Sequence, residues 1–404
     1  MLKKIILGFV IVASVYAQAA PSIEATTLEL TQKSNTATEK AHALYQWIAE
    51  NIAYDTETYR NGSRFVPFQD PAENAFQTRK ALCEGYAKLF KRMCNYAGIK
   101  CTVINGWAKG YNYTPGETFP LLPTHSWNAV FIDGSWKLID CTWAAGSLNT
   151  QGDFIKSYDE YWFFTPYNQF IFTHLPEQPS WQLLTRPVMK KEFETYPKLT
   201  ADFFRYGLNP NDNKYGTFTA GKEALFTFQV PDATVLTSQL SFWDSPDINQ
   251  PYTFERRTTS DTVEVLASFP SAGEYALKIF AKEAFVSGDY SSVVTYKIDV
   301  QQGNNYQQFA TTYGPYTDKK IILDPQTPIS AELKMGYQYF FKLIAPNATA
   351  VAIINDVDNS WQFLKKTGDA FEGYAEIKKG QVKLSAQFPE KNQAYSTLLE
   401  YTGK

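Results

Sequence analysis

Three residues of this 404-residue chain carry side chains that together could perform acyl transfer. Cys83 supplies a thiol, His125 an imidazole and Asp140 a carboxylate. A thiolate nucleophile, a general base and an acid that orients the base form the chemical set of a cysteine-dependent acyl transfer. Because the chain has only four cysteines and three histidines, few other combinations exist. We therefore predict Cys83 as nucleophile, His125 as base and Asp140 as orienting acid.

Cys83 stands where a helical pattern starts. Apolar residues recur behind it at helical spacing, at Tyr86, Leu89, Phe90, Met93, Cys94 and Ala97. A helix N-terminus stabilises a thiolate, and the unpaired backbone N–H of Cys83 could donate to an oxyanion. Cys94 falls within the apolar face and fits a buried structural cysteine better. The helix start thus favours Cys83 as the nucleophile.

A predicted hairpin brings His125 and Asp140 together. Asp133-Gly134 is a strong signal for a two-residue turn. With that turn, His125 lies opposite Thr142 and shares a face with Asp140. Diagonal neighbours on one face are about 7–8 Å apart at the backbone, within reach of long side chains. An aspartate there can hold the imidazole in one tautomer and stabilise its protonated form.

The remaining cysteines and histidines are interpreted as structural. Cys94 and Cys101 flank the Gly98 turn and are the favoured disulfide pair, although a free Cys83 leaves at least one further thiol unpaired. His42 fits a partly exposed surface histidine, and His174, in a proline-bounded segment, fits a structural one. Because the chain has no CxxC pair and its histidines are scattered, we expect no metal and no cofactor.

Local signals define the elements around these residues. Thr36-Ala-Thr-Glu39 fits a capping box that opens a helix, and Asp70-Pro71 fits an N-cap followed by proline. Gly98 fits a left-handed residue that ends the helix of Cys83. Helices are thus expected from residue 36 onward, over 72–78 and from 83 to 97, and strands over 100–109, 125–132 and 135–140. This order favours an α+β domain.

The N-terminus resembles a signal for export. Lys3-Lys4 precedes an apolar run over Ile5–Val15, and Ala17-Gln18-Ala19 fits a cleavage site. We expect cleavage after Ala19, export to the periplasm, cell surface or medium, and no transmembrane segment in the mature chain. The net charge of −3, without a later Lys/Arg tract, argues against nucleic acid as a partner.

Beyond residue 200, short strands punctuated by proline and glycine replace the helical pattern. Gly221, Phe226 and Pro231 recur as Gly336, Phe341 and Pro346 at a constant offset, 336 − 221 = 346 − 231 = 115. A repeat of this length suits two immunoglobulin-like β-sandwiches of about 100 residues each. The predicted organisation is a signal peptide over 1–19, a catalytic domain over 20–198 and β-sandwiches over 199–302 and 303–404.

Several segments together resemble the transglutaminase-like superfamily, and most closely its kyphoscoliosis peptidase-like branch. The matching stretches are Trp47 to Asp55, Cys83 to Phe90, Ala97 to Ile99, His125 to Val130, Gly134 to Trp143, His174 to Glu177 and Trp181 to Leu184. The resemblance covers residues from about 40 to 195. It implies a papain-like α+β core in which Cys83 is the nucleophile, His125 the base and Asp140 the orienting acid.

The resemblance also implies acyl transfer from an amide through a thioester. With water as acceptor the protein is a peptidase or amidase on protein or peptide substrates, including cell-wall peptides. With an amine it is a crosslinking transglutaminase. A second oxyanion donor is implied, with Gln69 and Gln77 among the candidates. Because some superfamily members have lost catalysis, a noncatalytic binding protein is a further alternative, and the sequence leaves substrate and oligomeric state open.

Overall fold

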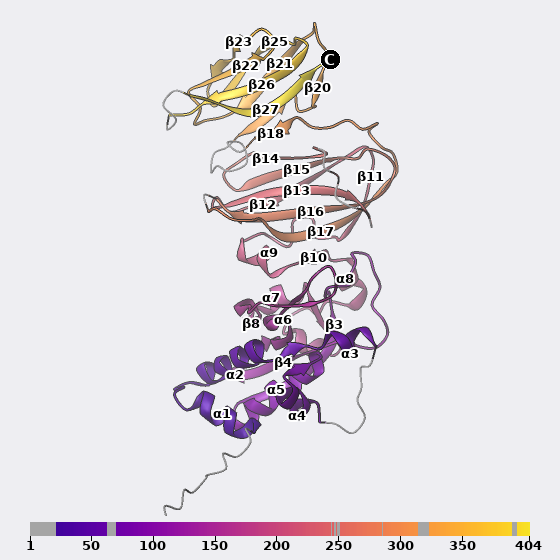
Figure 1. The fold of residues 1–404 in the computed structure, drawn as a ribbon, viewed down its shortest axis with the longest axis vertical. Coiled ribbons are helices and arrows are strands. Elements are labelled where there is room, and N and C mark those ends of the chain that lie inside the picture. The colour runs from indigo at the N-terminus through magenta and orange to yellow at the C-terminus, as the bar shows by residue number, and fades with distance from the viewer. Residues whose placement is uncertain are drawn as a thin grey trace, which may run out of the picture. The chain divides into compact units, whose positions relative to one another are not determined.

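The structure is a computed structural model that describes residues 22–62, 70–243, 245, 248, 251–284, 286–313, 323–389 and 394–404. The predicted signal peptide and Gln69 lie outside these residues. Figure 1 shows helices concentrated in the first part of the chain, from indigo to purple, and strands in the remainder. Among the described helices, none has the length and apolar character needed to cross a membrane.

Three predicted helices of the first part are confirmed, and their ends follow from local capping. The Thr36 side chain accepts from the Glu39 N–H while the Glu39 carboxylate accepts from the Thr36 N–H, which is the predicted capping box. Gly98 adopts a φ of +75°, as a left-handed residue after a helix does. The helices that precede the sheet are α1 (Ile23–Thr31), α2 (Ala37–Asn51), α3 (Thr56–Arg60), α4 (Pro71–Thr78) and α5 (Cys83–Tyr96). The three predicted ones are α2, α4 and α5.

A five-stranded sheet with the order β8-β5-β4-β3-β9 accompanies these helices. Its strands are β3 (Lys100–Ala108), β4 (His125–Ile132), β5 (Ser135–Ile139), β8 (Phe163–Thr165) and β9 (His174–Pro176). The β4–β5 hairpin has the predicted register, since Ile132 pairs with Ser135 and Asn128 with Ile139. Both turn residues, Asp133 and Gly134, have positive φ, as a type I′ turn requires.

One part of the hairpin prediction is wrong. β5 ends at Ile139, and Thr142 belongs to helix α6 (Cys141–Ala145) instead of pairing with His125. The cause is Asp140, whose carboxylate accepts from the backbone N–H of Thr142 and of Trp143. An aspartate in this role is an N-cap, so the chain turns into a helix where alternation alone predicts a longer strand.

Short elements complete the first part of the fold. They are β1 (Ala53–Tyr54), β2 (Lys80–Ala81), β6 (Gly146–Leu148), β7 (Phe154–Lys156), the 3-10 helices Glu160–Trp162 and Pro179–Gln182, α7 (Tyr167–Phe170) and α8 (Lys190–Thr195). β1 pairs with β2 in parallel, and β6 with β7 in antiparallel orientation. The fold is thus the predicted mixture of helices and strands.

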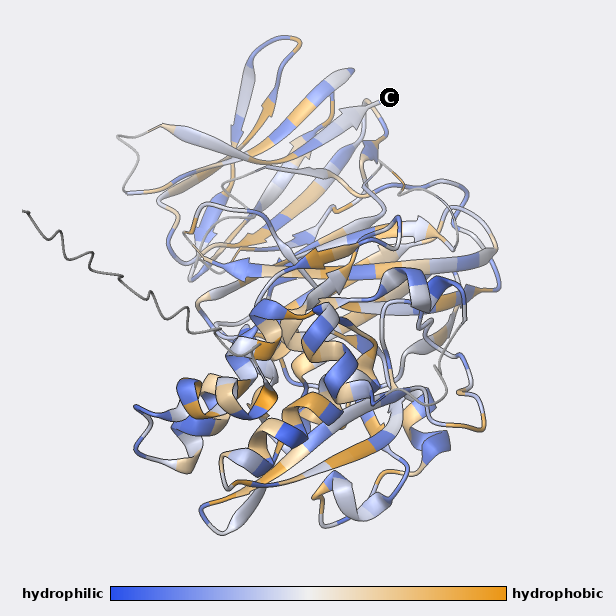
Figure 2. Cartoon of the chain, turned by 60° about the horizontal axis from the view of Figure 1, so that its bottom comes forward, coloured by the Kyte–Doolittle hydropathy of each residue, from blue (hydrophilic) through white to orange (hydrophobic). Residues whose placement is uncertain are grey.

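The first β-sandwich has two sheets, with the orders β10-β17-β16-β13 and β12-β15-β14, and β11 pairs with β17 in parallel. Its elements are β10 (Lys198–Leu199), α9 (Ala201–Arg205), β11 (Thr217–Ala220), β12 (Glu223–Gln229), β13 (Thr234–Phe242), β14 (Thr253–Arg257), β15 (Thr262–Ser268), β16 (Gly273–Glu283) and β17 (Ser291–Val300). Figure 2 shows apolar residues recurring between polar ones along such strands, because successive side chains point to opposite faces.

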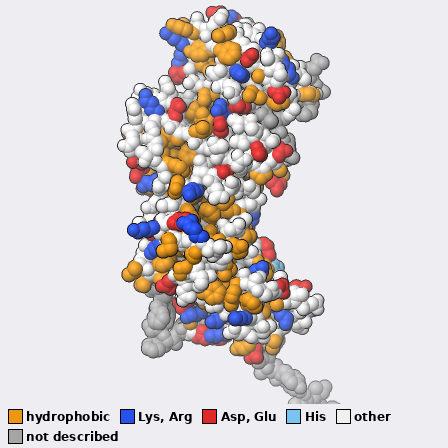
Figure 3. All heavy atoms as spheres, turned by 180° about the vertical axis from the view of Figure 1, so that it is seen from behind, with side chains coloured by type: hydrophobic (Ala, Val, Ile, Leu, Met, Phe, Trp, Pro, Cys, Tyr) orange, Lys and Arg blue, Asp and Glu red, His pale blue; other side chains and the backbone are white. Residues whose placement is uncertain are grey.

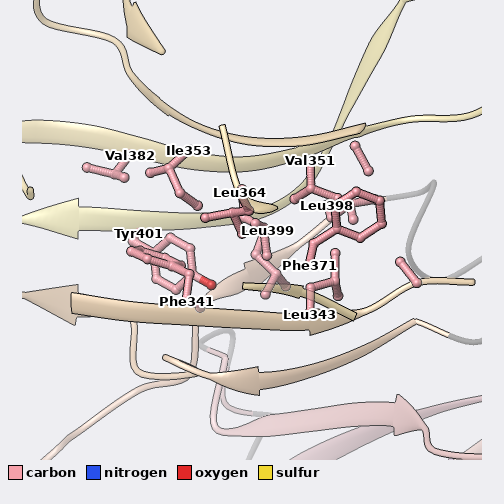
Figure 4. Packing of buried hydrophobic residues seen from close by; sticks show 14 of the residues in the cluster. Phe341, Leu343, Val351, Ile353, Leu364, Phe371, Val382, Leu398, Leu399 and Tyr401 are labelled. Carbon is pink, nitrogen blue, oxygen red and sulfur yellow. The ribbon is translucent and has the colours of Figure 1, made fainter. Parts of the chain in front are cut away.

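The second β-sandwich has sheets with the orders β18-β27-β26-β22-β23 and β19-β21-β25-β24, and β20 pairs with β27 in parallel. Its strands are β18 (Thr311–Thr312), β19 (Asp324–Thr327), β20 (Glu332–Leu333), β21 (Gln338–Ile344), β22 (Ala350–Asn355), β23 (Ser360–Phe363), β24 (Lys365–Thr367), β25 (Ala370–Glu376), β26 (Gly380–Gln387) and β27 (Tyr395–Gly403). Phe341, Leu399 and Tyr401 lie in its buried core (Figure 4).

The predicted internal repeat is confirmed by the two sandwiches. β12 and β21 hold the repeated segments, and their bounds differ by the offset found in the sequence, 338 − 223 = 344 − 229 = 115. The repeated phenylalanines, Phe226 and Phe341, are both buried. In each sandwich a short strand precedes the repeat and pairs in parallel with the last long strand. The domain boundaries themselves stay predictions.

Charged side chains are mixed on the surface. On the face shown in Figure 3, Lys and Arg side chains lie among Asp and Glu side chains instead of forming one block. This distribution agrees with the small net charge of the sequence. The expectation that nucleic acid is not a partner stays a prediction.

Candidate active site

Cys83 is the first residue of α5, as its sequence position predicts. The preceding Leu82 provides no side-chain cap, and its carbonyl accepts from the N–H groups of Gly85 and Tyr86. The first N–H groups of a helix have no partner within the helix, and the helix dipole favours negative charge there. Cys83 is partly exposed, whereas the other three cysteines are buried. Position and exposure thus separate Cys83 from the other thiols.

The predicted disulfide between Cys94 and Cys101 is wrong for this structure, because all four cysteines are free thiols. The Cys94 and Cys101 thiols lie close enough for Cys101 to affect the ionisation of Cys94. Burial, followed by the interaction with Cys101, raises the pKa of Cys94 well above its usual range. Burial, followed by the charge of Asp140, does the same for Cys141. Both thiols are therefore poor nucleophiles at neutral pH.

Asp140 is fully buried and is held by the start of α6. Its Oδ1 accepts from the Thr142 N–H at 2.7 Å and from the Trp143 N–H at 3.1 Å. Its own backbone N–H donates to the Trp162 carbonyl at 3.1 Å. These hydrogen bonds fix the Asp140 carboxyl group in position at the end of β5.

The structure brings His125 and Asp140 together, as the hairpin predicts, and adds His174. Among the described residues, these three form a group in which a ring nitrogen of each histidine and a carboxylate oxygen of Asp140 lie within 4.8 Å of one another. Such a group could also hold a metal ion, and the expectation of no metal stays a prediction. Sequence reasoning interpreted His174 as structural. The only signal for its place here was the resemblance of its segment to the kyphoscoliosis peptidase-like branch.

Asn128 ties the strand of His125 to the helix of Cys83. Its Nδ2 donates to the Ala87 carbonyl of α5 at 3.0 Å and to the Thr102 carbonyl of β3 at 3.1 Å. Ala87 lies about one helical turn after Cys83. Tyr86, in the same turn, is buried, and this burial, followed by Cys141, Tyr54 and Asp140, raises its pKa. The first turns of α5 therefore lie beside β4 and within electrostatic range of Asp140.

Two further predicted residues have surface roles. Gln77 is exposed on α4, and its Nε2 donates to the Glu73 carboxylate at 2.8 Å. His42 is partly exposed on α2, as expected, and its Nε2 lies 2.9 Å from a carboxylate oxygen of Glu160. The second oxyanion donor therefore stays unassigned among Gln77, the nearby aromatic residues and Gln69, which lies outside the described residues.

Comparison with known families agrees with this geometry. Residues 24–141 match the Transglutaminase-like superfamily, and residues 190–310 match the KY-like, immunoglobulin-like domain. The chain has a transglutaminase-like core followed by a KY-like immunoglobulin-like domain. Cys83, His125 and Asp140 all lie within the residues matched by the transglutaminase-like core. His174 lies between the two matched ranges.

Curated proteins are similar to this chain at a distance. Kyphoscoliosis peptidase of Mus musculus is 31% identical over 286 residues, which cover 70% of this chain and 40% of that protein. Hillarin of Drosophila melanogaster is 29% identical over 306 residues, covering 67% of this chain and 36% of that protein. A solved structure described as a TGase is 20% identical, with a TM-score of 0.24 over 34% of this chain and 33% of that chain. The chain is thus a distant homologue of kyphoscoliosis peptidase that spans 40% or less of these two curated relatives.

Proposed function

We propose that this chain is an exported cysteine peptidase or amidase that acts on amide bonds of protein or peptide substrates, including cell-wall peptides. Cys83 is the nucleophile, His125 the general base and Asp140 the acid that orients it. The observation that carries the proposal is the approach of the His125 ring to the buried Asp140 carboxylate. It is supported by the bond from Asn128 to α5, because this bond holds the helix of Cys83 against the same strand.

The environment of each thiol supports the choice of nucleophile. Cys83 combines partial exposure with a helix N-terminus, which lowers the energy of a thiolate. Cys94 and Cys141 are buried, with pKa values raised by that burial. Cys101 is buried as well and contacts Cys94. A substrate carbonyl can therefore reach one thiol far more readily than the others.

The proposed reaction passes through a thioester. His125 takes the proton of the Cys83 thiol, and the sulfur attacks the amide carbonyl carbon. The tetrahedral oxyanion collapses, the C–N bond breaks, and the amine leaves with the proton returned by the His125 imidazolium. Water then loses a proton to His125 and attacks the thioester, which gives a carboxylic acid and restores the Cys83 thiol. The Asp140 carboxylate stabilises the imidazolium formed in each half-reaction.

Alkylation of Cys83 tests the proposal without a known substrate. Iodoacetamide labels thiolates, so the labelling rate of the Cys83 peptide, followed by mass spectrometry across pH, reports its ionisation. We expect His125→Ala to need a higher pH than the wild type for the same labelling rate, because no imidazole takes the thiol proton in this variant. His42→Ala is the matched control, because His42 is a histidine of α2 that pairs with Glu160. Its profile should equal that of the wild type.

Two results would remove the proposal. One is a disulfide on Cys83 in protein isolated without reductant. The other is the same labelling profile in wild type and His125→Ala. If labelling behaves as expected, peptide libraries assayed with and without a labelled primary amine identify the acceptor. Cleavage without amine incorporation supports hydrolysis, and incorporation into glutamine-bearing proteins assigns crosslinking instead.

Export requires its own measurement. Fractionation of the producing cells and N-terminal sequencing of the mature protein should give a chain that starts at Ala20 outside the cytoplasm. A cytoplasmic protein that keeps Lys3-Lys4 would contradict export while leaving the thiol chemistry untouched.

A further inference from the structure

His174 is a buried histidine that the proposed reaction does not use. It begins β9 and pairs with Ala108 of β3. Its side chain has no exposed surface. A fully buried histidine needs partners for its ring nitrogens, because an unpaired polar group in the interior is costly. The contacts of this ring therefore indicate what it does.

Two neighbours fix the orientation of the His174 ring. Phe170 stacks on it, with ring centroids 4.1 Å apart and planes tilted by 19°. The Thr173 Oγ1 lies 2.8 Å from His174 Nδ1 and donates its hydrogen to the Phe170 carbonyl at 3.1 Å. Whichever tautomer His174 holds, this contact keeps Nδ1 beside the Thr173 hydroxyl. The stack with Phe170 and the contact with Thr173 together hold the ring in one orientation.

His125 lies against this locked ring. The two imidazole centroids are 5.3 Å apart, with planes tilted by 45°. β3 separates the strands of the two histidines in the sheet, and the Thr124 N–H, next to His125, donates to the Gly106 carbonyl of β3. One ring nitrogen of His174 belongs to the group that contains His125 and Asp140, while Nδ1 also lies beside Thr173.

We propose that His174 is a positioning residue for the proposed general base. Its ring holds the His125 ring in the orientation that keeps a nitrogen of His125 near the Asp140 carboxylate, and Thr173 and Phe170 hold His174 itself. His125 is partly exposed at the start of its strand, so its own surroundings restrict the ring less than those of a buried residue. A rigid polar partner removes unproductive rotamers, as outer groups around a catalytic histidine do. The inference rests on the proposed function of Cys83 and His125.

The decisive variant is His174→Phe. It keeps an aromatic ring for Phe170 to stack on and removes both nitrogens. We expect a melting temperature close to that of the wild type and a labelling profile of Cys83 displaced in the same direction as in His125→Ala, with slower labelling at neutral pH. His174→Ala should show the same displacement together with a lower melting temperature, because it also leaves a cavity.

Thr173→Val is the second variant and keeps His174 in place. It removes the hydroxyl that hydrogen-bonds Nδ1 while preserving most of the side-chain volume, so a smaller displacement in the same direction is expected. It also tests the proposal if His174→Phe fails to fold. A wild-type labelling profile in both His174→Phe and Thr173→Val would overturn the inference and leave His174 a packing residue.

The two proposals fail in different ways. If His125→Ala leaves the labelling of Cys83 unchanged, the proposed function fails, and the role of His174 fails with it. If His125→Ala displaces the profile but the His174 and Thr173 variants do not, only the positioning role is refuted. Peptide hydrolysis, once a substrate is identified, adds a further readout, since a positioning role predicts a loss in kcat that exceeds any rise in KM.

Discussion

Asn128 offers a sharp test of how the core holds the candidate site together. It is fully buried, and its Nδ2 donates to carbonyls of both α5 and β3. Asn128→Ala removes both bonds at once and leaves two buried carbonyls with one donor fewer. Because one of these bonds lies about one helical turn from Cys83, loosening it should also affect the candidate nucleophile.

The expected magnitude follows from the contacts. A net loss of about 0.5–1.5 kcal/mol for each hydrogen bond gives about 1–3 kcal/mol for the pair. The cavity left by the carboxamide raises the total to about 2–4 kcal/mol. Asn128→Asp should cost more, about 3–5 kcal/mol at neutral pH, because an ionised carboxylate cannot donate to either carbonyl. Burial would raise the pKa of that new carboxyl in the folded state, so stability should be recovered as pH falls toward about 4.

Urea unfolding followed by tryptophan fluorescence measures this loss. Seven of the nine tryptophans precede residue 200, so the signal reports mainly on the transglutaminase-like core. Asn355→Ala is the matched control, since Asn355 is a buried asparagine of the second sandwich whose Oδ1 accepts from the Lys378 N–H. It should leave the core transition and the labelling of Cys83 unchanged. A loss below about 0.5 kcal/mol in Asn128→Ala, the level of an ordinary surface change, would refute the reasoning.

Three further predictions concern the same core. Gly85→Ala should destabilise this core by up to about 2 kcal/mol in thermal unfolding, because the new Cβ would lie 2.7 Å from the Ala81 Cβ. Overpacking costs about 1–3 kcal/mol, which exceeds the gain of about 1 kcal/mol in helix propensity. A stabilised variant would contradict this prediction. Asp140→Asn should keep the cap of α6 and the melting temperature of the protein while displacing the labelling profile of Cys83. Asp140→Ala should displace the profile and also lose about 0.5–2 kcal/mol of stability, because alanine cannot cap the helix. A wild-type labelling profile in Asp140→Asn would rule out the orienting role of Asp140. Burial lowers the pKa of Lys109 well below its usual range, so the free energy of unfolding of the wild type should rise with pH between that lowered pKa and about 10.4. Over the same interval, the amount by which Lys109→Met is more stable than the wild type should shrink. A constant difference in stability between the two proteins would show that Lys109 keeps its proton.

Sequence reasoning succeeded where a few neighbouring residues decide the structure. The capping box at Thr36, the N-cap at Asp70 and the left-handed Gly98 each act over one helical turn, so their partners can be read directly from the chain. The Asp133-Gly134 turn fixes the register of its hairpin for the same reason. The repeated segments of the two sandwiches were recognisable because each begins with the same pattern of glycine, phenylalanine and proline.

The errors lie where two local signals compete or where a contact is distant in sequence. The hairpin register places Thr142 opposite His125, but the Asp140 cap on α6 ends the strand at Ile139. The spacing of Cys94 and Cys101 allows a disulfide, whereas the structure holds both as free thiols. Neither outcome follows from spacing alone, since each depends on the geometry in which the side chains finally meet.

The sequence by itself determined the transglutaminase-like core, the helix start at Cys83 and the hairpin that carries His125 toward Asp140. Only the tertiary structure decided that His174 joins them and that Asn128 links β4 to α5 and β3. The physical reason is the range of the interactions. Caps and turns act within a few residues, while the place of His174 depends on the pairing of β9 with β3, and that of Asn128 on how α5 packs against β4.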